Sequence, residues 1–150
     1  ERYIKSRILD LPIPELPDYP PVLNSVNAYL EWEDSAGDIE YISSERKVYS
    51  QRYMYSGTVD IYMRINDELV VADLKTSKGI YPEYHIQCAA YANAISEEDD
   101  VNIDKISVVR VPKDGNSVEI EERRDVDYLF GIFRACLVIW RWKNNWQVQE

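Results

Sequence analysis

The feature that most constrains the fold is a pair of apolar runs separated by the dipeptide Asn66–Asp67. The runs, Tyr53–Ile65 and Leu69–Lys75, are rich in β-branched and aromatic residues, a composition typical of strands. Asn and Asp tolerate the positive φ angles that a two-residue hairpin loop requires. The sequence therefore predicts two antiparallel strands that turn at this dipeptide.

A turn at Asn66 and Asp67 sets the register of the two strands. One expected face pairs Val59 with Leu74, Ile61 with Ala72, and Met63 with Val70, so it is wholly apolar. The other face places Asp60 directly opposite Asp73, and Thr58 opposite Lys75. Because the apolar pattern and the turn select the same pairing, the register is well specified.

The opposed aspartates are the unusual feature of this hairpin. Directly opposed residues have Cβ atoms about 4.5–5.5 Å apart, and like charges at that separation are destabilising. Two interpretations remain: the acids are solvated on an exposed sheet face, or a divalent cation lies between them. Hard oxygen ligands suit Mg²⁺ or Mn²⁺, and Lys75, one pleat from Asp73, could reach a water or phosphate at such an ion.

The segment after the hairpin predicts a helix that carries two further polar residues. "YPEYHIQCAAYANAIS" (Tyr81–Ser96) has Pro82 near its first position and small alanines suited to close packing. Gln87 and Tyr91 are four residues apart, so they share one face of this helix. Packing of that face against the sheet is the alternative to a role in the site.

These residues together resemble the RecB-like branch of the PD-(D/E)XK nuclease superfamily. The pattern of that family is a glycine-led aspartate, a D-x-K tripeptide and a downstream Q-x-x-x-Y. Gly57-Thr-Val-Asp60, Asp73-Leu-Lys75 and the pair Gln87 and Tyr91 match it in order. The tripeptide alone would be a weak signal, whereas the combined pattern over Gly57–Tyr91 is fairly specific.

The resemblance implies a role for each matching residue. Asp60 and Asp73 would hold a catalytic Mg²⁺ or Mn²⁺, with the main-chain carbonyl of Leu74 completing the inner shell. Lys75 would orient or help deprotonate the attacking water and stabilise charge on the phosphate. Gln87 and Tyr91 would contact the DNA or brace the site. Glu45, on the first expected strand, stands where many relatives carry a glutamate near the metal, or it is an exposed strand acid.

One departure from the family concerns histidine. RecB-like nucleases usually carry a metal-binding histidine on a helix upstream of the sheet, but the single histidine here, His85, is downstream. We expect His85 to be a surface or packing residue. Because the chain begins at Glu1 without Met, we also expect that the histidine-bearing helix precedes this sequence. Cys88 and Cys136 are too few for the four-cysteine iron–sulfur cluster of some relatives, so no such cluster is expected.

The remaining segments predict an α/β domain. Prolines between Pro12 and Pro21 indicate an extended arm, followed by a helix over Val22–Asp34 and a strand over Tyr41–Tyr49. "KISVVRV" and "SVEIEE" predict a second hairpin, and Asp125 is expected to cap a last helix. In that helix the spacing predicts a buried stripe of Leu129, Phe130, Phe133, Leu137 and Trp140. The expected fold is a restriction-endonuclease-like core with a mixed sheet of about five strands flanked by helices, in a single domain spanning residues 1–150.

The composition limits which classes of binding partner and which cellular location are compatible with this chain. The net charge of −10 argues against binding of polyanions by the whole surface, although basic residues gather around Arg46–Arg52 and Arg134–Lys143. No apolar run is long enough to cross a membrane, and we expect a cytoplasmic protein of a bacterial cell or phage-infected host.

The expected function is a Mg²⁺- or Mn²⁺-dependent deoxyribonuclease, an exonuclease of phage or bacterial recombination and repair. Its partners would be single-stranded DNA or duplex ends, and a recombination protein. The alternative is a non-catalytic module of the same fold that binds nucleic acid or a protein partner. A third interpretation, an unrelated acidic domain with incidental hairpin acids, does not account for Gln87 and Tyr91.

Overall fold

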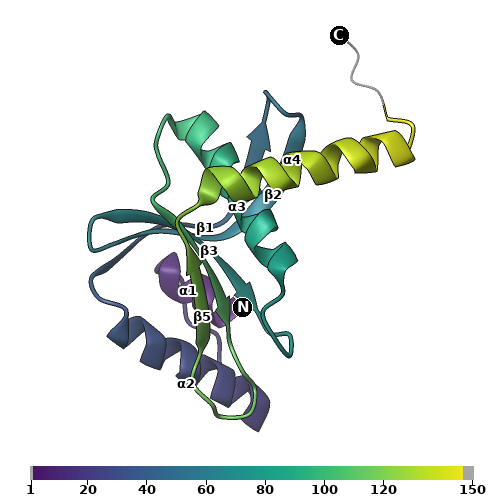
Figure 1. Cartoon of the computed structure of the whole chain (residues 1–150). Helices are drawn as coiled ribbons and strands as arrows, with labels where there is room; N and C mark the ends of the chain where they lie inside the picture. Colours follow the sequence, from purple (N-terminus) through teal and green to yellow (C-terminus); the bar gives the residue numbers. More distant parts are fainter. Residues whose placement is uncertain (1, 147–150) are drawn as a thin grey trace.

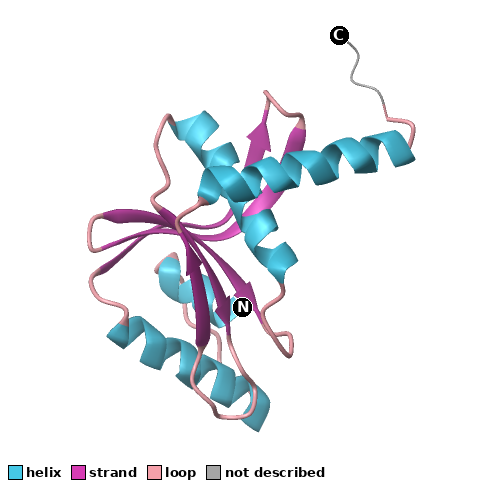
Figure 2. Ribbon diagram, in the orientation of Figure 1, coloured by secondary structure: helices cyan, strands magenta, loops and turns pink. Residues whose placement is uncertain are grey.

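A five-stranded mixed sheet forms the centre of the molecule (Figures 1 and 2). The computed structural model describes residues 2–146. The strands lie in chain order: β1 (Ile39–Ser50), β2 (Tyr55–Ile65), β3 (Glu68–Lys75), β4 (Lys105–Arg110) and β5 (Glu119–Arg123). All neighbours are antiparallel except β3 and β4, which are parallel. A parallel pair needs a crossover, and α3 (Pro82–Asp99) provides it.

Helices cover both faces of the sheet. α1 (Arg2–Ile8) and α2 (Pro20–Ser35) lie on one face, and α3 and α4 (Val126–Lys143) lie on the other (Figure 1). Each face therefore has its own apolar core, one centred on Tyr29 of α2 and the other on the alanines of α3. This architecture is α/β and agrees with the restriction-endonuclease-like core predicted from the sequence.

The β2–β3 hairpin turns where the sequence predicts. Asn66 and Asp67 have φ angles of 47° and 70°, the positive values that a tight hairpin loop requires. Ile61 pairs with Ala72 and Met63 with Val70, so the predicted register is confirmed. The ladder between the two strands ends at Ile61 and Ala72, one residue before the aspartates.

The expectation that Val59 shares an apolar face with Ile61 is wrong. Val59 packs in the core beneath α3, whereas Ile61 packs in the core beneath α1 and α2. The backbone pairing of β2 is interrupted between these two residues, since Asp60 pairs with neither neighbouring strand. On the β1 side the break coincides with Glu45, whose φ is 51°. A local break of this kind reverses the side to which the following side chains point.

The N-terminal region contains a helix that precedes the expected extended arm of Pro12–Pro21. Residues Arg2–Ile8 form the short helix α1, which the sequence analysis did not predict. The proline-rich stretch after it is non-helical, and α2 begins at Pro20. Ile4 of α1 is buried against the sheet, so tertiary contact holds a helix too short to be stable alone.

α4 departs from the prediction in its second half. Leu129 and Phe130 are buried as expected, but Trp140 is 56% exposed and does not belong to the core. Figure 1 shows α4 extending past the sheet, and in the described residues its last turn is held to the β1–β2 turn by Arg141, which donates to the carbonyls of Tyr53 and Met54. Asp125 precedes the helix without a capping hydrogen bond, because its carboxylate pairs with Arg123 instead. None of the helices in residues 2–146 is long and apolar enough to cross a membrane.

Candidate active site

A cleft of about 550 Å³ opens where β3 ends. One wall is formed by α3, the middle of β2 and the end of β3. The facing wall comes from α1 and the first turns of α2, with Ile4, Tyr19, Val22 and Val26. Asp60, Asp73, Lys75, Gln87 and Tyr91 all line this cleft. The structure therefore brings together five of the residues that the sequence analysis selected.

Asp73 is the most buried acid of the site. It is 3% exposed, and its Oδ2 lies 2.9 Å from the Lys75 ammonium. The contact is an ion pair without hydrogen-bond alignment, and no other group satisfies Oδ2. A buried carboxylate with spare acceptor capacity is costly unless a further positive charge or donor reaches it.

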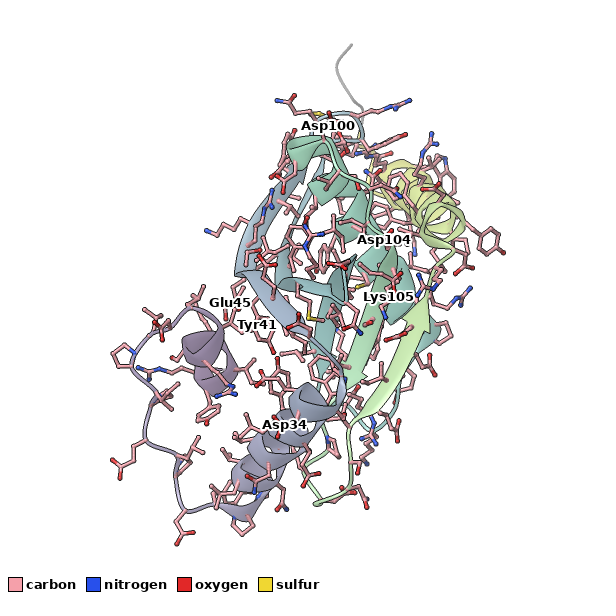
Figure 3. The ribbon with its side chains drawn as sticks, turned by 90° about the vertical axis from the view of Figure 1, so that its left-hand side faces the viewer. Asp34, Tyr41, Glu45, Asp100, Asp104 and Lys105 are labelled. Atoms are coloured by element: carbon pink, nitrogen blue, oxygen red, sulfur yellow. The ribbon has the colours of Figure 1, made fainter. Side chains whose placement is uncertain are left out.

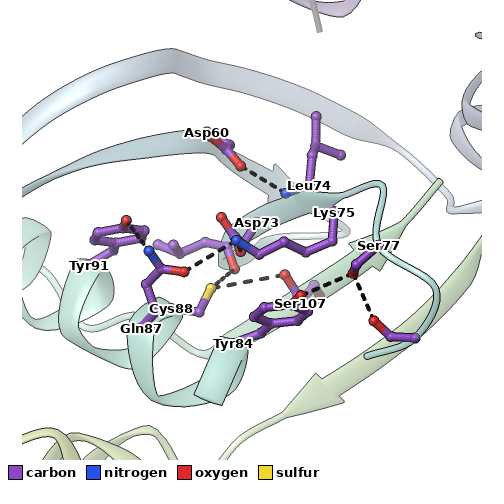
Figure 4. Close-up of polar contacts among 12 residues, drawn as sticks. Asp60, Asp73, Leu74, Lys75, Ser77, Tyr84, Gln87, Cys88, Tyr91 and Ser107 are labelled. Atoms are coloured by element: carbon purple, nitrogen blue, oxygen red, sulfur yellow. Dashed lines mark hydrogen bonds and ion pairs between the residues drawn. The ribbon is translucent and has the colours of Figure 1, made fainter. Parts of the chain in front are cut away.

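Asp60 lies beside Asp73 and is only half-buried. Its Oδ2 accepts a hydrogen bond of 2.9 Å from the backbone N–H of Leu74 (Figure 4). This bond takes the place of a ladder bond where β2 and β3 part. Burial, and then contact with the Asp73 carboxyl, raise the pKa of Asp60 to about 7, against the opposing effects of the Leu74 N–H and Lys75. Burial and the neighbouring Asp73 carboxyl therefore both favour the neutral form of Asp60.

Lys75 joins the aspartates to α3. Its Nζ donates to Gln87 Oε1 at 3.3 Å and lies 4.6 Å from the centre of the Tyr84 ring. Partial burial lowers its pKa, but Asp73 and Asp60 outweigh that effect, so the pKa is raised. The side chain is therefore an ammonium at neutral pH, which donates hydrogen bonds and does not accept a proton.

Gln87 and Tyr91 continue the polar chain along α3. Gln87 Nε2 donates to the Tyr91 hydroxyl at 2.8 Å, so the chain runs from Asp73 through Lys75 and Gln87 to Tyr91 (Figure 4). The face that carries this pair looks toward Lys75, as predicted. Tyr91 also packs at the edge of the α3 core, so it serves both packing and the polar chain.

Gly57 explains how Tyr91 reaches this position. A Cβ atom built on Gly57 would lie 2.4 Å from Tyr91 Cε1. The aromatic ring therefore rests directly on the backbone of β2, which only glycine permits. The glycine of the matched motif has a packing role that follows from its missing side chain.

Glu45 does not line the cleft that holds the two aspartates. Its carboxylate forms an ion pair with Lys5 of α1, and Figure 3 shows it on the α1 side of the sheet. It lines a small hollow with Asp60 and Leu74, but in residues 2–146 no three acidic, histidine or cysteine side chains form a group able to hold a metal. The two aspartates are thus the only paired carboxylates that the described part of the cleft offers.

His85 lies on α3 but does not line the cleft. It is buried, and its Nε2 is 2.6 Å from Glu121 Oε2 of β5. This contact ties α3 to the edge of the sheet, in agreement with the expected packing role.

The sequence analysis missed three contributors to the site. The Tyr84 ring lies beneath the Lys75 ammonium. Lys5 forms an ion pair with Glu45, and α2 contributes residues to the facing wall of the cleft. A signal for Tyr84 was present, because it precedes Gln87 by three residues and so lies on the same helix face. The contributions of α1 and α2 arise from long-range packing that no local pattern reveals.

Comparisons with known proteins identify no family. Searches against protein-family models and against curated proteins find no match. One similar solved structure is the crystal structure of SSO0001, with 18% sequence identity and a TM-score of 0.40. The alignment covers 77% of this chain and 60% of that protein. A similarity this distant supports no conclusion about the function of this protein.

Proposed function

We propose that this protein is a metal-dependent deoxyribonuclease that hydrolyses phosphodiester bonds in the cleft at the end of β3. The observation that carries the proposal is the convergence of Asp60, Asp73 and Lys75 in one cleft, beside the Gln87–Tyr91 pair. Two carboxylates and one ammonium are the groups that phosphodiester hydrolysis with a divalent ion requires. A structural hairpin has no need for that combination.

The residues present fit a divalent cation. Asp73 Oδ2 is buried and accepts no aligned hydrogen bond although the Lys75 ammonium lies 2.9 Å away, and the neighbouring Asp60 carboxyl adds a second group of oxygen ligands. Asp60, Asp73 and the Leu74 carbonyl would hold Mg²⁺ or Mn²⁺, which prefer oxygen ligands. When bound, the ion would lower the pKa of a water and polarise the phosphate.

Lys75, whose ammonium lies 2.9 Å from Asp73 Oδ2, would act on the reacting phosphate directly. As an ammonium it donates hydrogen bonds to phosphate oxygens and compensates their charge. Gln87 and Tyr84 hold its side chain over the cleft, so little reorganisation is needed when the phosphate arrives. Tyr91 orients Gln87 through the 2.8 Å hydrogen bond.

The size of the cleft supports action on strand ends. Its volume of about 550 Å³ is that of a pocket for one small molecule. The wall of Tyr19, Val22 and Ile4 faces the acids, and we expect it to favour entry of a single strand over an uninterrupted duplex. An exonuclease of recombination or repair is the form of the activity that this geometry favours.

The test is cleavage of end-labelled linear DNA beside a covalently closed circle, with Mg²⁺, with Mn²⁺ and with chelator. We expect metal-dependent loss of the linear form alone, abolished in Lys75→Ala and in Asp73→Ala. Metal binding, followed as a metal-induced rise in melting temperature, should persist in Lys75→Ala and disappear in Asp73→Ala. Cleavage of the circle would replace exonuclease by endonuclease.

A binding module of the same fold is the second candidate. It is favoured by the pairing of Glu45 with Lys5, which leaves only two carboxylates facing each other in the described cleft. This candidate becomes the better explanation if the protein binds DNA but cleaves neither substrate with either metal.

A further inference from the structure

A second concentration of charge lies outside the cleft, around Tyr53. In the described residues, most arginines have an acidic partner within ion-pair distance: Arg7, Arg46, Arg64, Arg110, Arg123 and Arg124. Three of those without such a partner in residues 2–146, Arg52, Arg134 and Arg141, gather at Tyr53. We refer to these three residues as the arginine cluster.

Aromatic rings and backbone carbonyls hold the arginine cluster. The guanidinium carbons of Arg52 and Arg134 lie 5.3 and 4.7 Å from the centre of the same Tyr53 ring. Arg141 Nη2 donates to the carbonyls of Tyr53 and Met54 at 2.6 and 3.0 Å, and its guanidinium carbon lies 4.4 Å from the Trp146 ring. Stacking stabilises the cations and leaves the edges of the exposed guanidinium groups of Arg52 and Arg134 free to donate.

Glu97 of α3 lies beside the turn but forms no ion pair with the arginine cluster. Glu97 accepts hydrogen bonds from Ser50, from the backbone N–H of Arg52 at 3.2 Å and from Asn93 at 2.9 Å. Its carboxylate is therefore occupied by neutral donors. In a chain of net charge −10, clustered arginines of this kind fit an external anion, and guanidinium groups match phosphate geometry.

An aromatic groove adjoins the arginine cluster. It has a volume of about 520 Å³ and is lined by residues that include Tyr55, Tyr84, Tyr91 and Phe133, with Glu83 as its acid. Tyr55 and Phe133 are in edge contact, with ring centres 4.9 Å apart, and Tyr53 and Tyr55 both pack against Phe130 of α4. The groove also shares Gln87 and Tyr91 with the cleft. The groove is thus joined to the candidate active site by two shared residues, and to the arginine cluster through Phe130, which contacts both Tyr53 and Tyr55.

We propose that the arginine cluster and the aromatic groove bind a single strand of nucleic acid. The arginines would contact its phosphates, and the rings of the groove would stack on bases, which only an unpaired strand exposes. The binding surface follows from the arginines and rings themselves. The further role of this surface, delivering the strand to the cleft, rests on the proposed nuclease function.

The experiment measures binding of a fluorescein-labelled oligothymidylate by anisotropy over a series of salt concentrations, in chelator so that nothing is cleaved. Arg52→Ala/Arg134→Ala should weaken binding about tenfold or more at low salt. It should also reduce the slope of log Kd against log salt by about 1.4, for two lost phosphate contacts on a single strand. Arg52→Lys/Arg134→Lys should recover most of the slope, because the charge remains.

The matched control is Arg64→Ala/Arg124→Ala, which removes the same charge. These two arginines are ion-paired with Glu40 and Glu68 near the opposite end of β2. The control should bind within about twofold of the wild type. Equal affinity and slope in the Arg52/Arg134 double variant would overturn the proposal. Displacement by a polyglutamate peptide as effective as unlabelled oligothymidylate would also overturn it, in favour of an acidic protein partner.

The result is separable from the nuclease test. A wild type that cleaves no substrate, but loses oligonucleotide affinity in the Arg52/Arg134 double variant, would refute the proposed activity and retain the binding surface. Metal-dependent cleavage together with unchanged affinity of that variant would refute the binding surface alone.

Discussion

At the scale of single residues, the site depends on two exceptions to regular strand structure. Asp60 sits at a break in β2, where its carboxylate accepts the N–H of Leu74. Gly57 lacks the side chain that would collide with Tyr91. Both exceptions lie within four residues on the strand, and each positions a polar group of the cleft.

The glycine exception can be tested by Gly57→Ala. The added methyl would lie 2.4 Å from Tyr91 Cε1. Because the aromatic ring is rigid, either the Tyr91 side chain or the β2 backbone would have to move. We expect a loss of about 1–3 kcal/mol in the free energy of unfolding, measured by urea denaturation, and a fall in any cleavage activity. Gly79→Ala is the control, since nothing lies within 4 Å of its added Cβ. Equal effects of the two substitutions would contradict the packing argument.

The aspartate pair predicts a pH-dependent stability. In the folded protein the pKa of Asp60 is raised from 3.8 to about 7, so the folded state keeps a proton that the unfolded state releases. Stability contributed by that proton is present at low pH and is lost as pH rises from about 4 to 7. Asp60→Asn removes the dependence and should stabilise the metal-free protein at pH 8 by about 1 kcal/mol, after allowance for solvent screening.

The measurement for Asp60→Asn is urea denaturation in chelator at pH 5 and pH 8. The gain should be largest at pH 8 and should shrink toward pH 5. Mg²⁺ or Mn²⁺ should then stabilise the wild type at pH 8 and leave the variant almost unaffected. A variant less stable than the wild type at pH 8 would show that the two carboxyls do not repel.

At the scale of elements, α4 divides into a packed half and a projecting half. Leu129 is 4% exposed, whereas Trp142 is 78% exposed. Leu129→Ala should therefore cost about 2–5 kcal/mol of unfolding free energy, and Trp142→Ala about 0.5 kcal/mol or less. Chemical denaturation followed by far-UV circular dichroism would compare the two variants. A loss above about 2 kcal/mol in Trp142→Ala would mean that another surface covers the end of α4 in solution.

At the scale of the whole molecule, one sheet separates two apolar cores. The core under α1 and α2 contains Tyr29, and the core under α3 and α4 contains Phe130. Strands β2 and β3 contribute to both, because Ile61 faces one core and Tyr62 the other. If one core is lost, the sheet loses the helices that cover that face. The other core packs on the same sheet and is therefore lost as well.

This shared sheet predicts a single cooperative unfolding transition. Trp32 packs on the first core, so its fluorescence in a variant with Trp140, Trp142 and Trp146 replaced by Phe would report on that side. Far-UV circular dichroism reports on all helices and strands. We expect the same urea midpoint from both probes. An earlier fluorescence transition would show that α1 and α2 unfold independently.

The resemblance to a known family implied that Gln87 would lie near Lys75. Local sequence patterns determined the hairpin turn at Asn66–Asp67, the register of Ile61 and Met63, and the helix that begins at Pro82. These features depend on backbone φ preferences and on periodicity, which a few neighbouring residues encode. Tertiary structure alone decided the break at Asp60, the helix α1, the pairing of Glu45 with Lys5, the exposure of Trp140 and the gathering of three arginines at Tyr53. Each of these depends on which distant surfaces meet, and a periodic pattern shows which side of an element is apolar but not whether anything lies there to cover it.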